Sequence, residues 1–291
     1  MLINLLKTMR PKQWAKNVFI FTALVFDEKL FTPSPLLKTI AAFIFFCLAS
    51  SAVYLINDLA DIEKDRQHPI KRLRPLPSGQ LKPSVAIAAA VLIPLVTLPL
   101  SFLLDLYFGF VVLVYLVTMI VYSFALKNIV ILDVLTVAAG FVLRVAAGAI
   151  VVKVERFSPW LYICTTLIAL FISVSRRRHE LILLAENANE HRASLNEYSL
   201  PLLDEMISVV ASATVIAYSL YTFSAPNLPP NHAMMLTIPF VLYGIFRYLY
   251  LIHVKSKGGT PEEIFLSDLP LITVLGLWAL AVIAILYFIG T

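Results

Sequence analysis

Apolar residues fill long, nearly uninterrupted stretches of this chain, and short polar segments separate them. Each stretch approaches the roughly 20 residues that a helix needs to cross the hydrocarbon core of a bilayer. Because lipid cannot satisfy exposed backbone N–H and C=O groups, such stretches are expected to be helices. The pattern predicts nine membrane-spanning helices, near residues 16–32, 36–58, 84–104, 107–126, 129–150, 158–176, 203–224, 233–252 and 270–289.

The composition agrees with a protein that is solvated mainly by lipid. Of the 291 residues, 60% are apolar and 14% are charged, and the mean hydropathy is +0.86. A soluble domain with so few polar groups would not cover its surface. No polar segment is long enough to form a separate soluble domain, so we expect a single membrane domain over residues 1–291.

Basic residues are distributed unevenly between the two sets of connections. With a cytoplasmic N-terminus, 18 of the 23 Lys and Arg residues lie on the cytoplasmic side and four lie on the other. The positive-inside rule therefore predicts this orientation, and we expect a multi-pass protein of the inner (plasma) membrane. The net charge of +5 reflects topology and anion binding, because no nucleic-acid-binding motif is visible and the aromatic residues lie in the spans.

Three aspartates directly follow the second predicted span. Asp58, Asp61 and Asp65 are spaced i, i+3, i+7, so on a helix that continues beyond the span they share one face. Asn57 adds an amide oxygen four residues before Asp61. Neighbouring carboxylates repel one another unless a cation lies between them, and Mg²⁺ prefers oxygen ligands and substrate phosphates. We predict that these four residues bind Mg²⁺ that bridges to a diphosphate; a solvated acidic helix end is the alternative.

A basic segment follows the aspartates, and its prolines and glycine exclude a continuous helix. Guanidinium and ammonium groups suit phosphate oxygens, so the segment is expected to bind phosphate. Anchoring on the cytoplasmic side is the alternative, and one loop can serve both purposes. The basic residues are Arg66, Lys71, Arg72 and Arg74.

Two motifs resemble those of a known family. The first signature of the UbiA superfamily of intramembrane prenyltransferases resembles Asn57-Asp58-x-x-Asp61-x-x-x-Asp65, followed by His68-Pro69 and Arg74-Pro75-x-Pro77-Ser78-Gly79. A further motif of that superfamily is similar to Tyr122-Ser123-x-x-Leu126-Lys127. The resemblance implies an all-α membrane protein, a UbiA-like bundle of about nine transmembrane helices whose active-site cavity faces the cytoplasm.

The chain departs from the superfamily pattern after the sixth predicted span. Aromatic prenyltransferases that it resembles carry a second Asp-x-x-x-Asp motif there, whereas this chain reads Ser175-Arg176-Arg177-Arg178-His179-Glu180-Leu181. A basic cluster in that place favours an additional anionic group. Phosphoribosyl diphosphate provides one, because it has a 5-phosphate besides its 1-diphosphate, and a lipid phosphate acceptor provides another.

The second basic cluster also carries a finer resemblance. Arg176-Arg177-x-x-Glu180-Leu181, with Arg10-Pro11-x-Gln13-Trp14-x-Lys16-Asn17, is similar to the polyprenyl-phosphate phosphoribosyltransferase branch. This resemblance implies Mg²⁺-dependent transfer of 5-phosphoribose from phosphoribosyl diphosphate to decaprenyl phosphate, with release of diphosphate, in cell-wall biosynthesis. It also implies a homo-oligomer, such as a trimer.

These arguments assign roles to sixteen residues. The predicted catalytic residues are Asp58, Asp61, Asp65 and Glu180. The predicted substrate-binding residues are Lys16, Asn17, Asn57, Arg66, Lys71, Arg72, Arg74, Tyr122, Lys127, Arg176, Arg177 and Arg247. We expect the arginine cluster to face the three aspartates across the cavity.

Two other functions fit parts of the pattern. The first is an aromatic prenyltransferase with an altered second motif, which would use a prenyl diphosphate. The second is a non-catalytic lipid-binding or transport protein. Transporters often contain repeated, interrupted helices with a binding site near the bilayer midplane, and neither feature is visible here.

Overall fold

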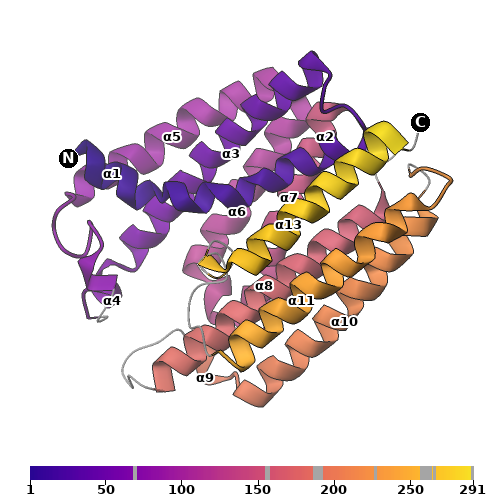
Figure 1. Ribbon diagram of the computed structural model, residues 1–291. Coiled ribbons are helices and arrows are strands. Elements are labelled where there is room, and N and C mark those ends of the chain that lie inside the picture. Colours follow the sequence, from indigo (N-terminus) through magenta and orange to yellow (C-terminus); the bar gives the residue numbers. More distant parts are fainter. Residues whose placement is uncertain are drawn as a thin grey trace. The chain divides into compact units, whose positions relative to one another are not determined.

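The computed structural model describes residues 1–67, 71–154, 158–185, 193–225, 228–255, 264 and 267–289. Within these ranges the chain forms helices and no strands, which confirms the predicted all-α class (Figure 1). Eight helical segments of the described chain are long and apolar enough to cross a membrane. The long helices are α3 (Pro33–Ala60), α5 (Pro83–Leu104), α6 (Leu106–Phe124), α7 (Leu132–Val152), α8 (Pro159–Ala185), α10 (Leu200–Ser224), α11 (Ile238–His253) and α13 (Leu269–Ala284).

Short helices complete several of these segments. The 3-10 helix η4 (Ala233–Thr237) leads directly into α11, and the π-helical turn η5 (Ile285–Ile289) extends α13. Eight of the nine predicted spans coincide with these segments within a few residues, although α8 continues to Ala185, well past the predicted end at residue 176.

The first predicted span, residues 16–32, differs from the prediction. This part of the chain contains the end of the 3-10 helix η1 (Pro11–Phe21) and the five-residue helix α2 (Thr22–Phe26), which is followed by a turn. Glu28 in that turn has a left-handed backbone, with φ 53°. No single helix here has the length of a span, so the ninth crossing stays a prediction.

The residues group into two compact units, which are described separately. The first unit comprises Met1–Leu24, Lys29–Glu155 and Glu190–Ser194. The second comprises Val25–Glu28, Arg156–Asn189 and Leu195–Thr291.

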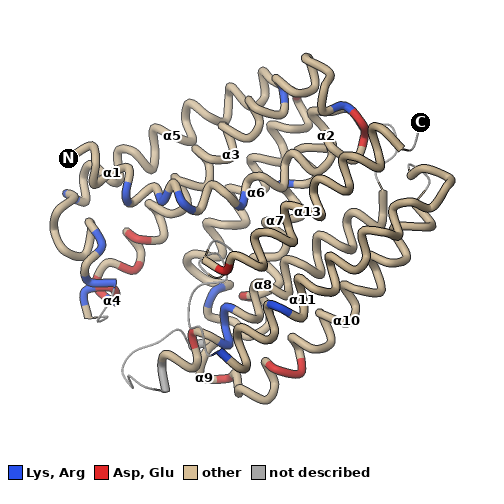
Figure 2. The backbone as a smooth tube through the Cα atoms, in the orientation of Figure 1, with Lys and Arg blue, Asp and Glu red and all other residues tan. Residues whose placement is uncertain are grey.

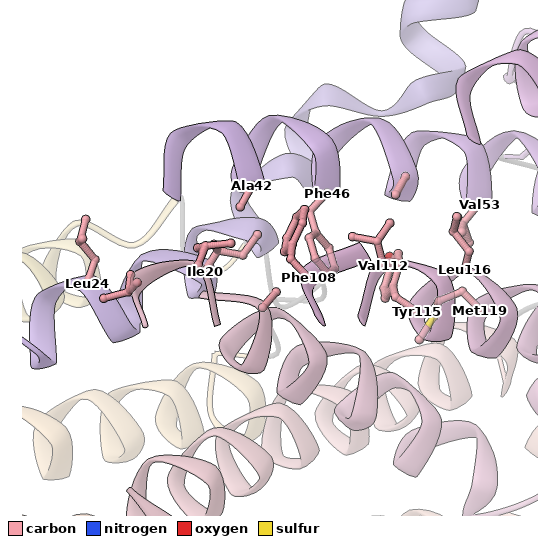
Figure 3. Packing of buried hydrophobic residues seen from close by; sticks show 14 residues of the cluster. Ile20, Leu24, Ala42, Phe46, Val53, Phe108, Val112, Tyr115, Leu116 and Met119 are labelled. Carbon is pink, nitrogen blue, oxygen red and sulfur yellow. The ribbon is translucent and has the colours of Figure 1, made fainter. Parts of the chain in front are cut away.

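The core of the first unit lies where α3 packs against α6, α7 and η1. Aromatic side chains from α3 and α6 meet there: the rings of Phe46 and Tyr115 lie 5.2 Å apart, and those of Phe46 and Phe108 lie 6.0 Å apart (Figure 3). Gly148 of α7 lets η1 approach closely, because a methyl group there would overlap the backbone carbonyl of Ile20.

A second apolar cluster in the first unit lies near the end of α3. Leu76 and Leu81 of the segment after α4 are almost fully buried, and they pack with Leu55 of α3 and Met9 of α1 (Leu2–Met9). Each buried leucine contributes roughly 1.5–3 kcal/mol of hydrophobic stabilisation. The cluster thereby fixes both the N-terminal helix and the loop after α4 against α3.

The second unit is built from α8 packed on α10 and from α11 packed on α13. Tyr218 of α10 links three of its elements: its hydroxyl bonds to Thr237 at 2.6 Å and accepts a hydrogen bond from Trp278 Nε1 at 2.8 Å. The last turns of α8 carry the basic sequence that begins at Arg176.

Charged residues are rare in the middle of the long helices (Figure 2). In the first unit they gather around α4 (Ile62–Gln67) and along the segment from α1 to η1. In the second unit they gather at the end of α8 and the start of α10. Arg144 of α7 is an exception, since it lies inside a membrane-spanning helix and is buried.

Candidate active site

The aspartates predicted from the sequence lie where α3 ends and α4 begins. The helix breaks for one residue at Asp61, whose φ and ψ are −102° and 10°. Helical hydrogen bonds persist across the break, because Asp61 N–H donates to the carbonyl of Asn57 and Asp65 N–H donates to that of Asp61. The expected continuation of the helix is therefore right in outline, with a local kink at the middle aspartate.

Two of the aspartates share one basic partner. Asp58 and Asp65 are both buried, and Nη1 of Arg74 lies 3.3 Å from an oxygen of Asp58 and 2.7 Å from an oxygen of Asp65. Arg10 also donates to Asp58 through Nη2, and Lys71 Nζ lies 3.9 Å from Asp65. A single cationic nitrogen thus stands between the two carboxylates, as expected for residues two helical turns apart.

Asp61 has a different partner. Nζ of Lys127 donates to both of its carboxylate oxygens, at 2.6 and 2.7 Å. Lys127 lies on η3 (Leu126–Asn128), the short 3-10 helix that follows α6, and it is 5% exposed. The backbone carbonyl of Lys127 in turn accepts a hydrogen bond from the buried hydroxyl of Ser194 at 2.9 Å.

The loop after α4 positions Arg74 above the end of α3. Leu81 N–H donates to the carbonyl of Pro75. Gly79 has φ 77°, a backbone conformation that residues other than glycine rarely adopt. Burial, and secondly the charge of Arg10, lower the pKa of the Arg74 guanidinium, while the two carboxylates beside it raise that pKa. An arginine remains charged under these conditions, so Arg74 stays a cationic donor.

The donor set suits a hard divalent cation. All three aspartates offer oxygen ligands, and Arg74 shows that one cation is accommodated between Asp58 and Asp65. Among the described residues, no group of three or more His, Cys, Asp or Glu side chains is arranged to hold a metal ion. Mg²⁺ usually binds one or two carboxylates and completes its shell with water and phosphate oxygens, so this arrangement fits a metal that arrives with a phosphate ligand.

Other predicted residues of this region take varied positions. Asn57 is half-buried beside Asp58, Tyr122 and Lys16 are half-buried, and Arg72 is exposed. Arg66 is exposed as well, and it pairs with Glu63 at 2.7 Å rather than with an aspartate of the cluster.

Asn17 lies away from the aspartates, inside the first unit. It is fully buried, its amide nitrogen contacts Cys47 Sγ at 3.2 Å and Ser50 Oγ at 3.3 Å, and its amide oxygen accepts from Arg144 Nε at 2.6 Å. The amide oxygen and nitrogen of Asn17, which was predicted to bind substrate, are thus both bonded to other groups of the protein.

Arg10 has a more direct place in the site than the sequence suggested. It appeared there only as part of an N-terminal motif, yet its guanidinium contacts Asp58 and lies 5.0 Å from the ring centre of Tyr54. The signal available in the sequence was the step from an apolar helix to Arg10-Pro11, where Arg10 adopts φ 55° and ends α1.

The second unit contains the predicted basic cluster. Glu180 accepts hydrogen bonds from Arg176 Nε at 3.2 Å and from Arg177 Nη1. Arg177 is 2% exposed, whereas the Arg176 side chain is 36% exposed. One carboxylate therefore organises two neighbouring guanidinium groups that lie about one turn before it on α8. The predicted opposition of this cluster and the three aspartates, which lie in the first unit, stays a prediction.

The remaining arginines of the second unit connect helices. Arg247 of α11 forms a two-pronged ion pair with Asp268, which is buried and caps the start of α13, at 3.0 and 2.9 Å. Arg178 pairs with Asp204 of α10 at 2.5 Å. The contact with Asp268 gives Arg247 a structural role. That Arg247 binds substrate stays a prediction.

The structure describes one of the two histidines in the quoted motifs. His68 lies outside the described residues. His179 is half-buried on α8, between Arg178 and Glu180.

Comparisons with known proteins identify a family and several relatives. A family model described as the UbiA prenyltransferase family matches residues 18–267. A protein of Corynebacterium glutamicum named decaprenyl-phosphate phosphoribosyltransferase is 30% identical, over 98% of this chain and 87% of its own length. A protein of that name from Mycobacterium tuberculosis is 32% identical, over 97% of this chain and 92% of its own length.

The fold is also found among solved structures. A UbiA homologue from Archaeoglobus fulgidus bound to GPP and Mg²⁺ matches with a TM-score of 0.75 at 17% identity, over 97% of this chain and 99% of that chain. The family match covers most of the sequence, and the spans mark an integral membrane protein. This chain belongs to the UbiA prenyltransferase family.

Proposed function

We propose that this protein transfers 5-phosphoribose from phosphoribosyl diphosphate to a polyprenyl phosphate such as decaprenyl phosphate, and releases diphosphate. The observation that carries the proposal is the end of α8, where Arg176 and the buried Arg177 surround a single acid, Glu180. Two basic groups with one acid suit a phosphate monoester better than a second metal. The names of the relatives, which match nearly the whole chain, support the same reaction.

The acidic cluster binds the diphosphate half of the donor. Asp58, Asp61 and Asp65 would hold Mg²⁺, and the metal would supply positive charge to offset that of the leaving diphosphate. The cations that now pair with these carboxylates are Arg10, Arg74 and Lys127. With the carboxylates holding a metal, these side chains would be available to donate to phosphate oxygens.

The chemical step exchanges one C–O bond for another. The bond from ribose C1 to the diphosphate oxygen breaks, and a bond forms from C1 to an oxygen of the lipid phosphate. A phosphate monoester is largely ionised near pH 7, so no side chain has to remove a proton from the nucleophile. Catalysis then depends on positioning the substrates and on stabilising charge in the transition state. The charged side chains described above can do both.

The arginine cluster recognises the 5-phosphate of the donor. Arg176 is the more exposed of the two guanidinium groups, and Glu180 fixes its orientation from one turn away. Arg177 is buried and keeps Glu180 in place. The active site faces the cytoplasm in this proposal, which the excess of basic residues in one set of loops supports.

A donor assay tests the proposal. Purified protein in lipid nanodiscs is given labelled phosphoribosyl diphosphate, polyprenyl phosphate and Mg²⁺, and the lipid fraction is analysed by mass spectrometry. The expected product is a polyprenyl phosphate that carries phosphoribose, and chelation of the metal abolishes it. Turnover only with a prenyl diphosphate and an aromatic acid would instead make the protein an aromatic prenyltransferase. Saturable lipid binding without turnover of any donor would support the binding or transport alternative.

Variants separate the two clusters. Asp58→Asn and Asp65→Asn should each lower turnover at least about 100-fold, the scale of removing a group that stabilises transition-state charge. Glu63→Gln is the matched control, because Glu63 lies on α4 together with Asp65 but is exposed and pairs with Arg66. Full activity in both asparagine variants would exclude these residues from the site.

A second pair of variants tests recognition of the 5-phosphate. Arg176→Gln should raise KM for phosphoribosyl diphosphate and weaken inhibition by ribose 5-phosphate, with a smaller effect on inhibition by inorganic diphosphate. The control is Lys255→Gln, which removes one positive charge from an exposed position of the same unit. Equal weakening of both inhibitors would contradict the assigned role of Arg176.

A further inference from the structure

The 3-10 helix η1 is unusually long. It covers eleven residues, Pro11–Phe21, whereas 3-10 segments longer than three or four residues are uncommon because their hydrogen-bond geometry is poorer. Something outside the segment must therefore stabilise this winding. The residues along η1 that contact neighbouring helices supply the explanation.

The anchors of η1 repeat every three residues. Trp14 Nε1 donates to Ser51 Oγ at 3.0 Å, Asn17 bonds to Ser50 and Arg144, and the backbone of Ile20 lies against Gly148. In a 3-10 helix residues three apart stand in one row, since each turn contains three residues. In an α-helix each such step drifts by about 60°, so Ile20 would be rotated about 120° away from Trp14.

Arg144 occupies the centre of this row. Its three nitrogens donate to Asn17 Oδ1 at 2.6 Å, to the carbonyl of Gly140 at 2.6 Å and to the hydroxyl of Tyr115 at 3.0 Å. Its guanidinium also lies 4.8 Å from the ring centre of Tyr115, whose side chain points into the core together with Phe46 (Figure 3). The fork therefore joins η1, α6 and α7 at one point.

The space around Arg144 is shaped to admit it. A methyl group on Gly140 would lie 2.7 Å from Met119 Cε and 3.3 Å from Arg144 Nη1. The groups that Arg144 contacts in the described part of the chain are neutral, namely an amide, a carbonyl and a hydroxyl, together with aromatic rings. An ionised residue inside a membrane span is costly and is retained mainly where it has a functional task.

We infer that Arg144 is a positioning residue: through Asn17 it holds η1 in the 3-10 winding that presents Arg10 to Asp58. Arg10 directly precedes η1 as its N-cap residue, and its guanidinium contacts Asp58 of the acidic cluster. The inference rests on the proposed function only in taking that cluster as the diphosphate site.

The expected displacement follows from helix geometry. A 3-10 helix rises about 2.0 Å per residue and an α-helix about 1.5 Å. Over the seven residues from Asn17 to Arg10, relaxation to an α-helix would withdraw Arg10 by about 3.5 Å. A hydrogen bond does not survive a shift of that size. Loss of the Arg144 fork should therefore disconnect Arg10 from the site without any direct contact between Arg144 and a substrate.

Trp14 provides a reporter that does not depend on activity. The protein has three tryptophans, so Trp160→Phe with Trp278→Phe leaves Trp14 alone. In this background we compare Arg144→Lys with Thr136→Val, a control on the same helix. Thr136 is similarly buried, and its hydroxyl donates to the carbonyl of Leu132 in its own helix. The readouts are Trp14 emission and the binding of inorganic diphosphate in the presence of Mg²⁺.

The inference predicts different results for the Arg144 variant and for its control. Arg144→Lys should shift Trp14 emission to longer wavelength and weaken diphosphate binding about tenfold or more, the scale of one charge-assisted hydrogen bond, because an ammonium group cannot reproduce the three-way fork. Thr136→Val should change neither. Gly148→Ala, which pushes on the backbone of η1 while Arg144 is intact, should act in the same direction.

Two results would overturn the inference. One is unchanged Trp14 emission and diphosphate affinity in Arg144→Lys. The other, which decides the matter if that variant does not fold, is an unchanged Trp14 environment in Gly148→Ala. Because inorganic diphosphate is the product of either donor class, a protein that used prenyl diphosphate would refute the proposed function and leave this inference standing.

Discussion

The ion pair between Asp61 and Lys127 offers the sharpest test of how the acidic cluster is stabilised. Lys127 Nζ lies 2.6 and 2.7 Å from the two oxygens of Asp61, and the two residues are 66 positions apart in the sequence. The lysine side chain is 6% exposed and that of the aspartate is 19% exposed. The pair joins the end of α3 to the short helix after α6, so both stability and charge balance depend on it.

The magnitude follows from the burial of the two partners. Removing one partner of a buried pair costs roughly 3–5 kcal/mol, because the other charge is left without compensation. Lys127→Met should lie near the lower limit, about 3 kcal/mol, since Asp61 is partly reached by water. Asp61→Asn should cost at least as much, because the ammonium group that it leaves behind is more deeply buried. The double variant buries neither charge, so its cost should fall well below the sum of the single costs.

A double-mutant cycle measures this coupling. Reversible denaturation of the wild type, both single variants and the double variant is followed in metal-free mixed micelles, and a coupling energy of about 2–3 kcal/mol is expected. The exposed pair of Arg66 and Glu63 is the matched control, with an expected coupling under about 0.5 kcal/mol. Additivity of the Asp61 and Lys127 variants within about 0.5 kcal/mol would refute the reasoning.

Three further variants test other parts of the structure. Arg74→Lys should weaken binding of Mg²⁺ with diphosphate about tenfold, because an ammonium group lacks the planar fork; equilibrium dialysis measures this, and unchanged binding would contradict it. Gly148→Ala should destabilise the first unit by about 1–3 kcal/mol through overpacking against η1, as seen in thermal denaturation. Asp268→Asn should lower the melting temperature without raising KM for either substrate, because its contact with Arg247 caps and joins helices; a raised KM would restore Arg247 to the binding site.

The sequence predicted the long helices well because the bilayer fixes their length. Eight predicted spans coincide with helices of the structure. Helix α8 extends beyond its apolar part, because residues 176–185 continue the same helix. The prediction of one continuous helix over residues 16–32 was wrong for a physical reason. Apolar content along one segment does not reveal that Trp14 and Asn17 bond to neighbouring helices and that the winding follows those bonds.

The acidic site was predictable as far as local geometry determines it. The spacing of Asp58 and Asp65 places both on one face, and Arg74 bridges them as a basic residue of the next loop would. The kink at Asp61 was not visible in the spacing, so its separate partner, Lys127, was known only as a member of another motif. Pairing of Arg10 with Asp58 spans 48 positions, and no local rule indicates it.

Asn17 shows why a motif does not by itself assign a contact. It stands beside Lys16 in the N-terminal motif, so both were predicted to bind substrate, yet Asn17 is fully buried and bonds to Arg144. A buried amide whose oxygen and nitrogen are both engaged has no free group for substrate, but the inference above gives it a part in positioning η1. The 3-10 winding of η1 makes this coupling stiff, because Arg10, Trp14 and Asn17 are tied to fixed partners. Under the proposed function, motif residues of this chain therefore divide into those that would touch phosphate and those that set the position of such residues.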